Sequence, residues 1–330
     1  ACDILEVEDD YQSVDIEKSK LKKIKFQHSP PVRFNKKFES QLSQSKNISL
    51  FINANLVDID GEKNLIKAAY FQNYKNYNFF IKAKKFVFAM GGIENPRYLL
   101  WFAKKYQSKF FDASTPIGKY WMEHPHFTLG SALVDKSISN HRFYSLTYEA
   151  QKQSKILGCG FRFTEYSTKG TKELIRNLLC AAPKHGAKIA ELANKNLICG
   201  IKFRAVWEQD PVDSNSVTLT TKTDRHGIPR VHLHQLKSNF DRKTVKESVR
   251  AFNDWLLESD IGRIQLHRWM IDDLAYPILD EIAVHHHMGG TRMFDNSRLG
   301  VVDKNCKVYG SNNLSFSCAT CERARASCKF

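Results

Sequence analysis

The segment FVFAMGGIENPRYLL, residues 86–100, decides the fold expected for this chain. Its first part, Phe86–Ala89, is a short continuous apolar run, which is typical of a strand buried on both faces. Gly91 and Gly92 follow after one residue, and a helical pattern runs from Arg97 onward. We therefore predict a buried strand that turns through glycines directly into a helix.

A glycine turn at a helix start allows a ligand to approach the backbone closely. The helix N-terminus offers unpaired N–H groups and a partial positive charge to an anion or an electron-rich ring. An ordinary strand–helix turn, in which glycine relieves strain, explains the same residues equally well. The G-x-G-x-x-G fingerprint of dinucleotide-binding turns does not occur in the sequence, so the residues alone leave both interpretations open.

The residues before this turn predict strands. Residues 48–59 alternate well enough for one or two strands, and residues 66–90 resemble a β-meander that turns at Lys75-Asn76. Beyond about residue 116 the pattern changes to antiparallel α+β. We expect a hairpin around Asp224–Gly227, followed by an amphipathic helix over residues 241–257.

The run HHHMGGTRM, residues 285–293, is the second candidate for chemistry. A neutral imidazole near pH 7 suits the removal of a proton from a hydroxyl group. Successive side chains of an extended segment point to opposite sides, so the three histidines cannot all face one site. Structural or metal-binding roles explain histidines as well, but no Asp, Glu or Cys stands beside them at ligand spacing.

The run GKYWMEHPH, residues 118–126, places His124 before a proline, which holds that residue extended. A structural role and a direct role in a site are equally compatible with this pattern.

Composition excludes several classes of protein. The 330 residues are 42% hydrophobic and 26% charged, as in a globular protein, and no apolar run is long enough to span a bilayer. Lys and Arg total 50 against 35 for Asp and Glu, which gives a formal charge of +15. The basic residues are scattered, and the Lys20–Lys25 cluster interleaves only weakly with aromatics. We therefore expect a solvated lysine-rich surface and no nucleic-acid partner.

Cysteines are concentrated near the end of the chain, at Cys318, Cys321 and Cys328. A lone C-x-x-C pair lacks the four ligands of a structural zinc site, so we expect no metal. The start, ACDILEVEDD, has neither the basic residues nor the apolar run of a secretory signal, which predicts a cytoplasmic protein.

Together these motifs resemble the glucose–methanol–choline (GMC) oxidoreductases, which use FAD. The likeness is carried by HHMGGTRM (residues 286–293), by LGVVDKNCKVYG with Asn313-Leu314 (residues 299–314), and by residues 86–100, 118–125 and 214–230. SPPVRF at residues 29–34 is similar to a run of many bacterial members. The resemblance extends over nearly the whole chain up to Leu314, whereas residues 315–330 match none of the expected ending.

The resemblance implies an α/β plus α+β fold: part of a Rossmann-like FAD-binding domain over residues 1–115, an antiparallel-sheet substrate domain over 116–275, and a return to the FAD-binding domain over 276–330. It also implies that the family's N-terminal dinucleotide-binding unit is missing. That unit, the missing half of the same enzyme, would be a partner of this chain.

The implied reaction is hydride transfer to FAD from the CH–OH group of an alcohol or sugar. His286 is the implied catalytic base, with His287 as the neighbour it could be confused with. Ala89, Gly91, Gly92 and Glu94 are implied to lie near the flavin or its phosphates. Leu56 is implied to lie near the adenine. Two other classes stay open: an inactive, truncated remnant of such an enzyme, and a basic binding module.

Overall fold

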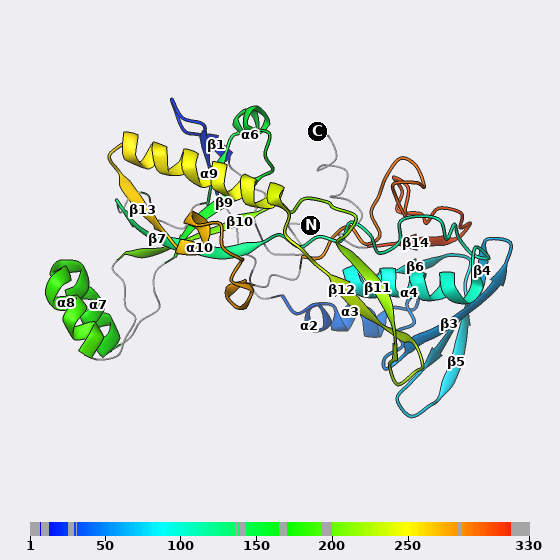
Figure 1. Ribbon diagram of the computed structural model, residues 1–330. Coiled ribbons are helices and arrows are strands. Elements are labelled where there is room, and N and C mark those ends of the chain that lie inside the picture. Colours follow the sequence, from blue (N-terminus) through cyan, green and yellow to red (C-terminus); the bar gives the residue numbers. More distant parts are fainter. Residues whose placement is uncertain are drawn as a thin grey trace. The chain divides into compact units, whose positions relative to one another are not determined.

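The computed structural model divides into two compact units, each with its own core (Figure 1). The structure describes residue 7 and residues 13–25, 30, 32–135, 138, 143–164, 170–192, 200–282 and 286–317. Unit 1 consists of Ala1–Pro30, His124–Gln209 and Asn239–Val284, and unit 2 of Pro31–Glu123, Asp210–Ser238 and His285–Phe330. The assignment of the predicted residue ranges to FAD and substrate domains stays a prediction.

Unit 1 is built on an antiparallel seven-stranded sheet. The strands, in spatial order, are β1 (Ser13–Asp15), β2 (Leu21–Ile24), β8 (Phe143–Leu146), β9 (Cys159–Thr164), β10 (Ile201–Trp207), β7 (His126–Val134) and β13 (Gly262–Leu266). Burial alternates along β9 and β10, as expected where one sheet face packs on a core.

Helix α9 (Asn239–Glu258) covers the core face of this sheet. The ring centre of Phe252, on this helix, lies 4.9 Å from that of Phe161 on β9. It lies 5.8 Å from the ring centre of Phe203 on β10, and these two rings are stacked. The expected apolar face of this helix is confirmed, because Val245, Val249, Phe252 and Leu256 are all buried. The other helices in the described part of unit 1 are α6 (Tyr148–Ser154), α7 (Thr171–Ala181), α8 (Pro183–Leu192), α10 (Arg268–Ile271) and the short η1 (Ile278–Asp280).

Among its described residues, unit 2 combines three small sheets with one long helix. The sheets are the antiparallel meander β3 (Asn55–Glu62), β4 (Leu65–Gln72) and β5 (Asn78–Lys82), the parallel pair β6 (Phe86–Phe88) and β14 (Leu314–Phe316), and the hairpin β11 (Ser216–Thr223) with β12 (Pro229–His234). The helices are α2 (Phe34–Lys37), α3 (Glu39–Gln44) and α4 (Gly91–Tyr106). The expected hairpin and strand–glycine–helix turn are thereby confirmed. The meander expected over residues 66–90 is confirmed for β4 and β5 only, because β6 pairs with β14 and not with β5.

One expectation about β6 is wrong. Phe86 and Phe88 are buried, with 9% and 6% of their surface exposed, but Val87 between them is 59% exposed. Phe86 and Phe88 pack into the core of unit 2, whereas the face of β6 that carries Val87 is largely uncovered in the described structure. The apolar run therefore predicted the strand correctly. It predicted burial correctly for only one of the two faces of that strand.

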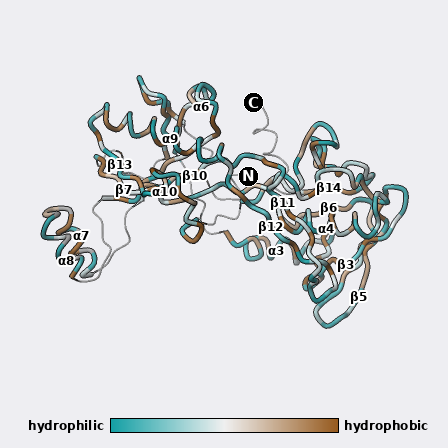
Figure 2. The backbone as a smooth tube through the Cα atoms, viewed as in Figure 1, coloured by the Kyte–Doolittle hydropathy of each residue, from teal (hydrophilic) through white to brown (hydrophobic). Residues whose placement is uncertain are grey.

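Hydrophilic and hydrophobic residues alternate along α9, the longest described helix (Figure 2). Across the described ranges, every helix is too short or too polar to cross a bilayer.

Candidate functional site

The turn between β6 and α4 is the first element of the candidate site. Gly91 begins α4 with φ at 90°, a left-handed value that favours glycine. The backbone N–H of Met90 donates to Oδ1 of Asn95 at 3.1 Å, and Asn95 is completely buried. A side chain one turn into the helix thus fixes the approach of the chain to the helix start.

The backbone at Gly91 lies open. A Cβ atom at this position would meet no heavy atom within 4 Å in the described structure. Ala89, two residues earlier, is exposed, whereas Gly92 is buried. A planar or anionic group could therefore reach the backbone N–H groups at this helix start, which fits a flavin or its phosphates.

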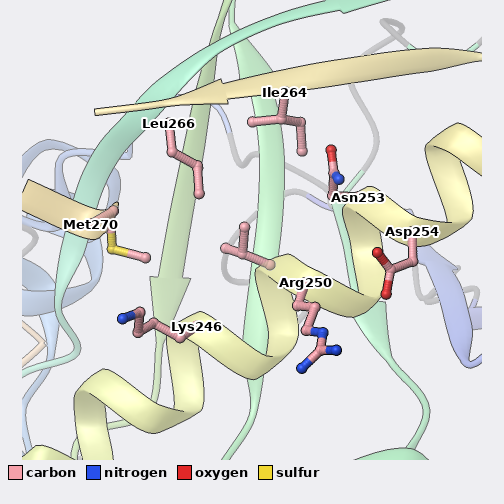
Figure 3. A pocket seen from close by; sticks show the side chains of 8 residues that line it. Lys246, Arg250, Asn253, Asp254, Ile264, Leu266 and Met270 are labelled. Carbon is pink, nitrogen blue, oxygen red and sulfur yellow. The ribbon is translucent and has the colours of Figure 1, made fainter. Parts of the chain in front are cut away.

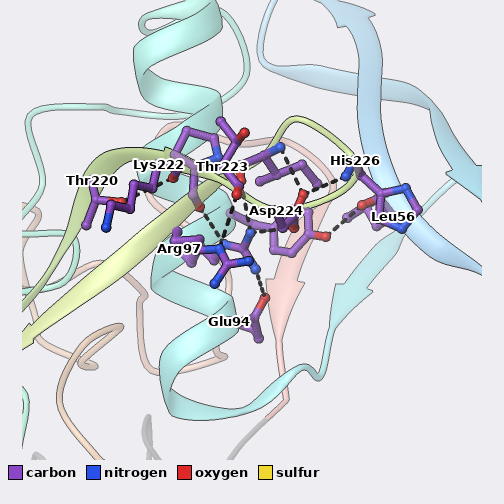
Figure 4. Close-up of polar contacts among 12 residues, drawn as sticks. Leu56, Glu94, Arg97, Thr220, Lys222, Thr223, Asp224 and His226 are labelled. Carbon is purple, nitrogen blue, oxygen red and sulfur yellow. Dashed lines mark hydrogen bonds and ion pairs between the residues drawn. The ribbon is translucent and has the colours of Figure 1, made fainter.

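Glu94 belongs to an ionic network that ties α4 to the β11–β12 hairpin (Figure 4). The Arg97 guanidinium lies 2.9 Å from Glu94 Oε2 and 2.6 Å from Asp224 Oδ2. Arg97 Nε also donates to the backbone oxygen of Pro229 at 2.7 Å. One arginine therefore joins the first helical turn after the glycines to the end of the hairpin.

Asp224 is held in its ionised form. Burial opposes ionisation, but the hydrogen bond from Arg97 and those from the backbone N–H groups of His226 and Ile228 outweigh it, so the pKa of Asp224 lies below its ordinary value. Arg97 also loses solvation, yet its bonds to Asp224 and Glu94 raise its pKa. The Arg97–Asp224 pair is therefore charged at neutral pH.

The histidine segment is docked on residues 118–123 by backbone hydrogen bonds. Met122 and Met288 exchange two of them, at 2.8 and 2.9 Å, and the Gly118 N–H donates to the Gly290 oxygen at 2.8 Å. Gly289, at φ 91°, lies directly against the carbonyl of Tyr120. The glycine is required here because a Cβ atom would overlap that oxygen.

Glu123 lies beneath the two described histidines of this segment. Its Oε2 accepts a hydrogen bond from the backbone N–H of His286 at 2.8 Å and lies 3.7 Å from Nε2 of His287. The His287 ring also lies 5.1 Å from the ring of the buried Trp121. His287 is thus oriented by a carboxylate and an aromatic ring, whereas the side chain of His286 is exposed.

The histidine segment also reaches the glycine turn. A Cβ atom at Gly290 would lie 3.1 Å from Cγ of Pro96 and 3.5 Å from the backbone oxygen of Gly92. The structure therefore brings together three segments that the sequence singled out separately: residues 86–100, 118–123 and 286–293. All three belong to unit 2.

Leu56 lies apart from this turn. Its side chain is 8% exposed and belongs to the core of unit 2. Its backbone oxygen accepts a hydrogen bond from the Tyr98 hydroxyl at 2.6 Å, so β3 lies beside α4 at this level. The predicted place near an adenine stays a prediction.

Sequence reasoning missed Glu123, Trp121 and the pair Arg97–Asp224 as parts of the candidate site. Each stands within a motif that was recognised, but its partner is more than 100 residues away along the chain. The spacing of residues within one segment carries no signal for such contacts.

Among the described residues, no group of three or more His, Cys, Asp or Glu side chains is placed to hold a metal ion. His285 and the C-x-x-C pair at Cys318 and Cys321 lie outside the described residues. Cys159 is buried, and its burial raises the pKa of the thiol.

A groove in unit 1, between α9 and β13, contains none of the predicted site residues (Figure 3). It is lined by Lys246, Val249, Arg250, Asn253, Asp254, Ile264, Leu266 and Met270.

Comparison with known proteins agrees with the resemblance seen in the motifs. Residues 211–316 match the family model described as GMC oxidoreductase. This match covers the hairpin and the histidine segment and confirms the likeness to the C-terminal portion of that family. No curated protein matches the chain.

Several solved structures share the fold. A formate oxidase variant from Aspergillus oryzae RIB40, studied for FAD modification, is 16% identical with a TM-score of 0.51, over 85% of this chain and 57% of that one. Pyridoxine 4-oxidase from Mesorbium loti is 13% identical with a TM-score of 0.52, over 84% and 54%. An FAD-dependent oxidoreductase from Chaetomium thermophilum is 13% identical with a TM-score of 0.50, over 86% and 59%. The chain thus spans little more than half the length of these proteins.

Proposed function

We propose that this chain is the C-terminal portion of an FAD-dependent oxidoreductase that oxidises the CH–OH group of an alcohol or sugar. The observation that carries the proposal is the packing of the glycine turn of α4 against the segment of His286 and His287. The family match over residues 211–316 supports the same conclusion. Because the chain spans 57% of the formate oxidase, a further dinucleotide-binding unit is proposed as its partner.

FAD, when bound, supplies the acceptor for the hydride that leaves the carbinol carbon. Gly91 and the N-terminal N–H groups of α4 are the groups of this chain that would lie against it, because the backbone there is open. Glu94 is held by Arg97, so its carboxylate keeps a fixed place beside the same turn.

A histidine of this segment takes the hydroxyl proton as the carbon–hydrogen bond breaks. The alcohol loses one hydride from carbon and one proton from oxygen, and a carbonyl forms. The resemblance assigns the proton to His286. The contacts favour His287, since an imidazole oriented by a carboxylate and packed on a ring is pre-organised for proton transfer.

The test is anaerobic mixing of the FAD-loaded protein, with its proposed dinucleotide-binding unit present, with single substrates. The panel contains a primary alcohol, an aldose, pyridoxine and formate, the last two because related folds belong to enzymes named for them. We expect the visible flavin absorbance to bleach with at least one CH–OH compound. Flavin that dithionite reduces but that no CH–OH compound reduces would contradict the proposal and favour an inactive remnant.

A further inference from the structure

The face of the unit 1 sheet opposite α9 carries a cluster of cationic and polar side chains. Burial alternates along β9 and β10, so Phe161, Phe163, Phe203 and Ala205 face the helix. The alternate residues point to the other face. We call four of these residues the arginine face: His126 on β7, Arg162 and Thr164 on β9, and Arg204 on β10.

Two arginines stand directly opposite each other on this face. Arg204 pairs with Arg162 in the register of β10 and β9. Directly opposed residues on one face have Cβ atoms about 5 Å apart, and like charges there are destabilising. Neither guanidinium takes part in an ion pair of the described residues, and that of Arg162 lies 5.6 Å from the centre of the Phe143 ring.

Three polar atoms of the arginine face are buried and lack hydrogen-bond partners in the part of the chain that the structure describes. They are Nε of Arg204, Nδ1 of His126 and Oγ1 of Thr164. Buried polar groups are nearly always paired in folded proteins, and an unpaired one costs about 1–3 kcal/mol. Three such atoms on adjacent strands of one face indicate a place where a ligand supplies the partner.

The arginine face is also electrostatically uncompensated. Burial and the charges of Arg204 and Arg162 lower the pKa of His126 to about 4. Burial and Arg162 lower the pKa of Arg204. A nearby carboxylate would act in the opposite sense, so these directions agree with a cationic site that lacks its anion.

The backbone at the arginine face is irregular. The register between β10 and β7 shifts between Phe203 and Arg204, which is a β-bulge that leaves Leu129 as the extra residue. Bulges re-aim neighbouring side chains and are common beside functional sites. Here the irregularity falls at the residue with the buried, unpaired Nε atom.

We propose that the arginine face binds a small ligand through a carboxylate or phosphate group, with Arg162 and Arg204 as the ion-pairing residues. A guanidinium presents its N–H donors in a planar fork that matches two oxygens of either group. Nε of Arg204 and the hydroxyl of Thr164 supply further hydrogen bonds. An exposed lysine ammonium group is a point charge and does not offer two parallel N–H donors to the two oxygens.

The experiment is an NMR titration of the histidine ring signals with sodium acetate, inorganic phosphate or sodium chloride at matched ionic strength. We expect the His126 signals to shift saturably with acetate, phosphate or both, and not with chloride. Binding of phosphate alone assigns the site to phosphate ligands, and binding of acetate to carboxylates. An equal response to chloride, or no saturation with either oxyanion, would overturn the proposal.

Variants distinguish the site from general charge effects. Arg204→Gln and Arg162→Gln should each weaken binding by about tenfold or more, the usual effect of losing a charge-assisted hydrogen bond. Arg250→Gln removes an exposed positive charge from α9, on the other side of the sheet, and should leave the affinity unchanged. An equal loss in all three variants would show that net charge, and not the arginine face, drives binding.

Two controls separate an effect on folding from an effect on ligand binding. Arg204→Lys keeps the charge and loses the fork, so it should fold as the wild type does and bind with intermediate affinity. Circular dichroism checks the fold of each variant. The titration needs neither flavin nor turnover, so its result is independent of the proposed oxidation.

Discussion

Gly289 packs against Tyr120 so closely that any side chain at residue 289 would overlap the Tyr120 carbonyl oxygen. The contact involves two backbones, which have little freedom to move apart, because flanking hydrogen bonds join Met122 to Met288 and Gly118 to Gly290. This backbone contact fixes the distance between the histidine segment and residues 118–123.

Gly289→Ala should therefore destabilise unit 2 strongly. The left-handed φ of 91° and the overlap with Tyr120 each contribute, and together they should cost about 2–4 kcal/mol of unfolding free energy. Urea denaturation of the variant and the wild type measures the difference.

Gly227→Ala is the matched control. Gly227 also has positive φ, at 76°, but a Cβ atom there would meet nothing within 4 Å. It should cost only the backbone strain, about 1–2 kcal/mol. Equal losses at residues 227 and 289 would show that the Tyr120 contact does not matter.

A second prediction concerns the ion pair of Arg97 and Asp224. Asp224→Asn removes the charge that Arg97 meets at 2.6 Å, with 11% and 26% of the two side chains exposed. The variant should lose about 1–3 kcal/mol at pH 7, because a partly buried guanidinium loses its charged partner. Asp60→Asn, at an exposed carboxylate 3.9 Å from Lys109, should change stability by less than about 0.5 kcal/mol.

The effect of Asp224→Asn should depend on pH with a definite sign. The pKa of Asp224 is lowered in the folded state, so its contribution is complete above the pKa of the unfolded chain, about 3.9. It is lost as pH falls through the lower, folded value. Unfolding curves of the two proteins should therefore converge in acid. A stability gap that grows as pH falls would contradict this assignment.

A third prediction follows from the exposed side of β6. Val87 is 59% exposed on a strand whose neighbours Phe86 and Phe88 are buried. An exposed apolar strand favours association with another chain. Val87→Lys should reduce self-association in sedimentation velocity runs, whereas Leu257→Lys, at a site on α9 that is 55% exposed, should not. Monodisperse wild-type monomer at all concentrations would oppose this expectation.

Local patterns in the sequence predicted the elements of the fold well. The strand–glycine–helix turn, the β4–β5 meander, the hairpin and the apolar face of α9 all depend on residues close together along the chain. The exposure of Val87 could not be predicted this way, because it depends on what packs against that face of β6, which the local sequence does not reveal.

The candidate site was predictable as three motifs and not as an assembly. Glycine pairs at Gly91-Gly92 and Gly289-Gly290 marked the positions of close backbone approach. Their mutual packing depends on Pro96, whose ring lies nearest to Gly290. Glu123 gave no signal because a carboxylate becomes informative only once its partner, the segment of His286 and His287, is placed beside it.

The histidine pair tests the proposed chemistry most directly. The measurement is the rate of flavin reduction by substrate in FAD-loaded His287→Ala and His286→Ala, with flavin content determined for each. His287→Ala should slow reduction by about 10²–10⁴-fold with flavin retained, the usual contribution of a general base, and His286→Ala by less than about tenfold. If His286→Ala instead slows flavin reduction more than His287→Ala does, His286 is the base. If each variant slows flavin reduction by less than about tenfold, the result contradicts a histidine base at this site.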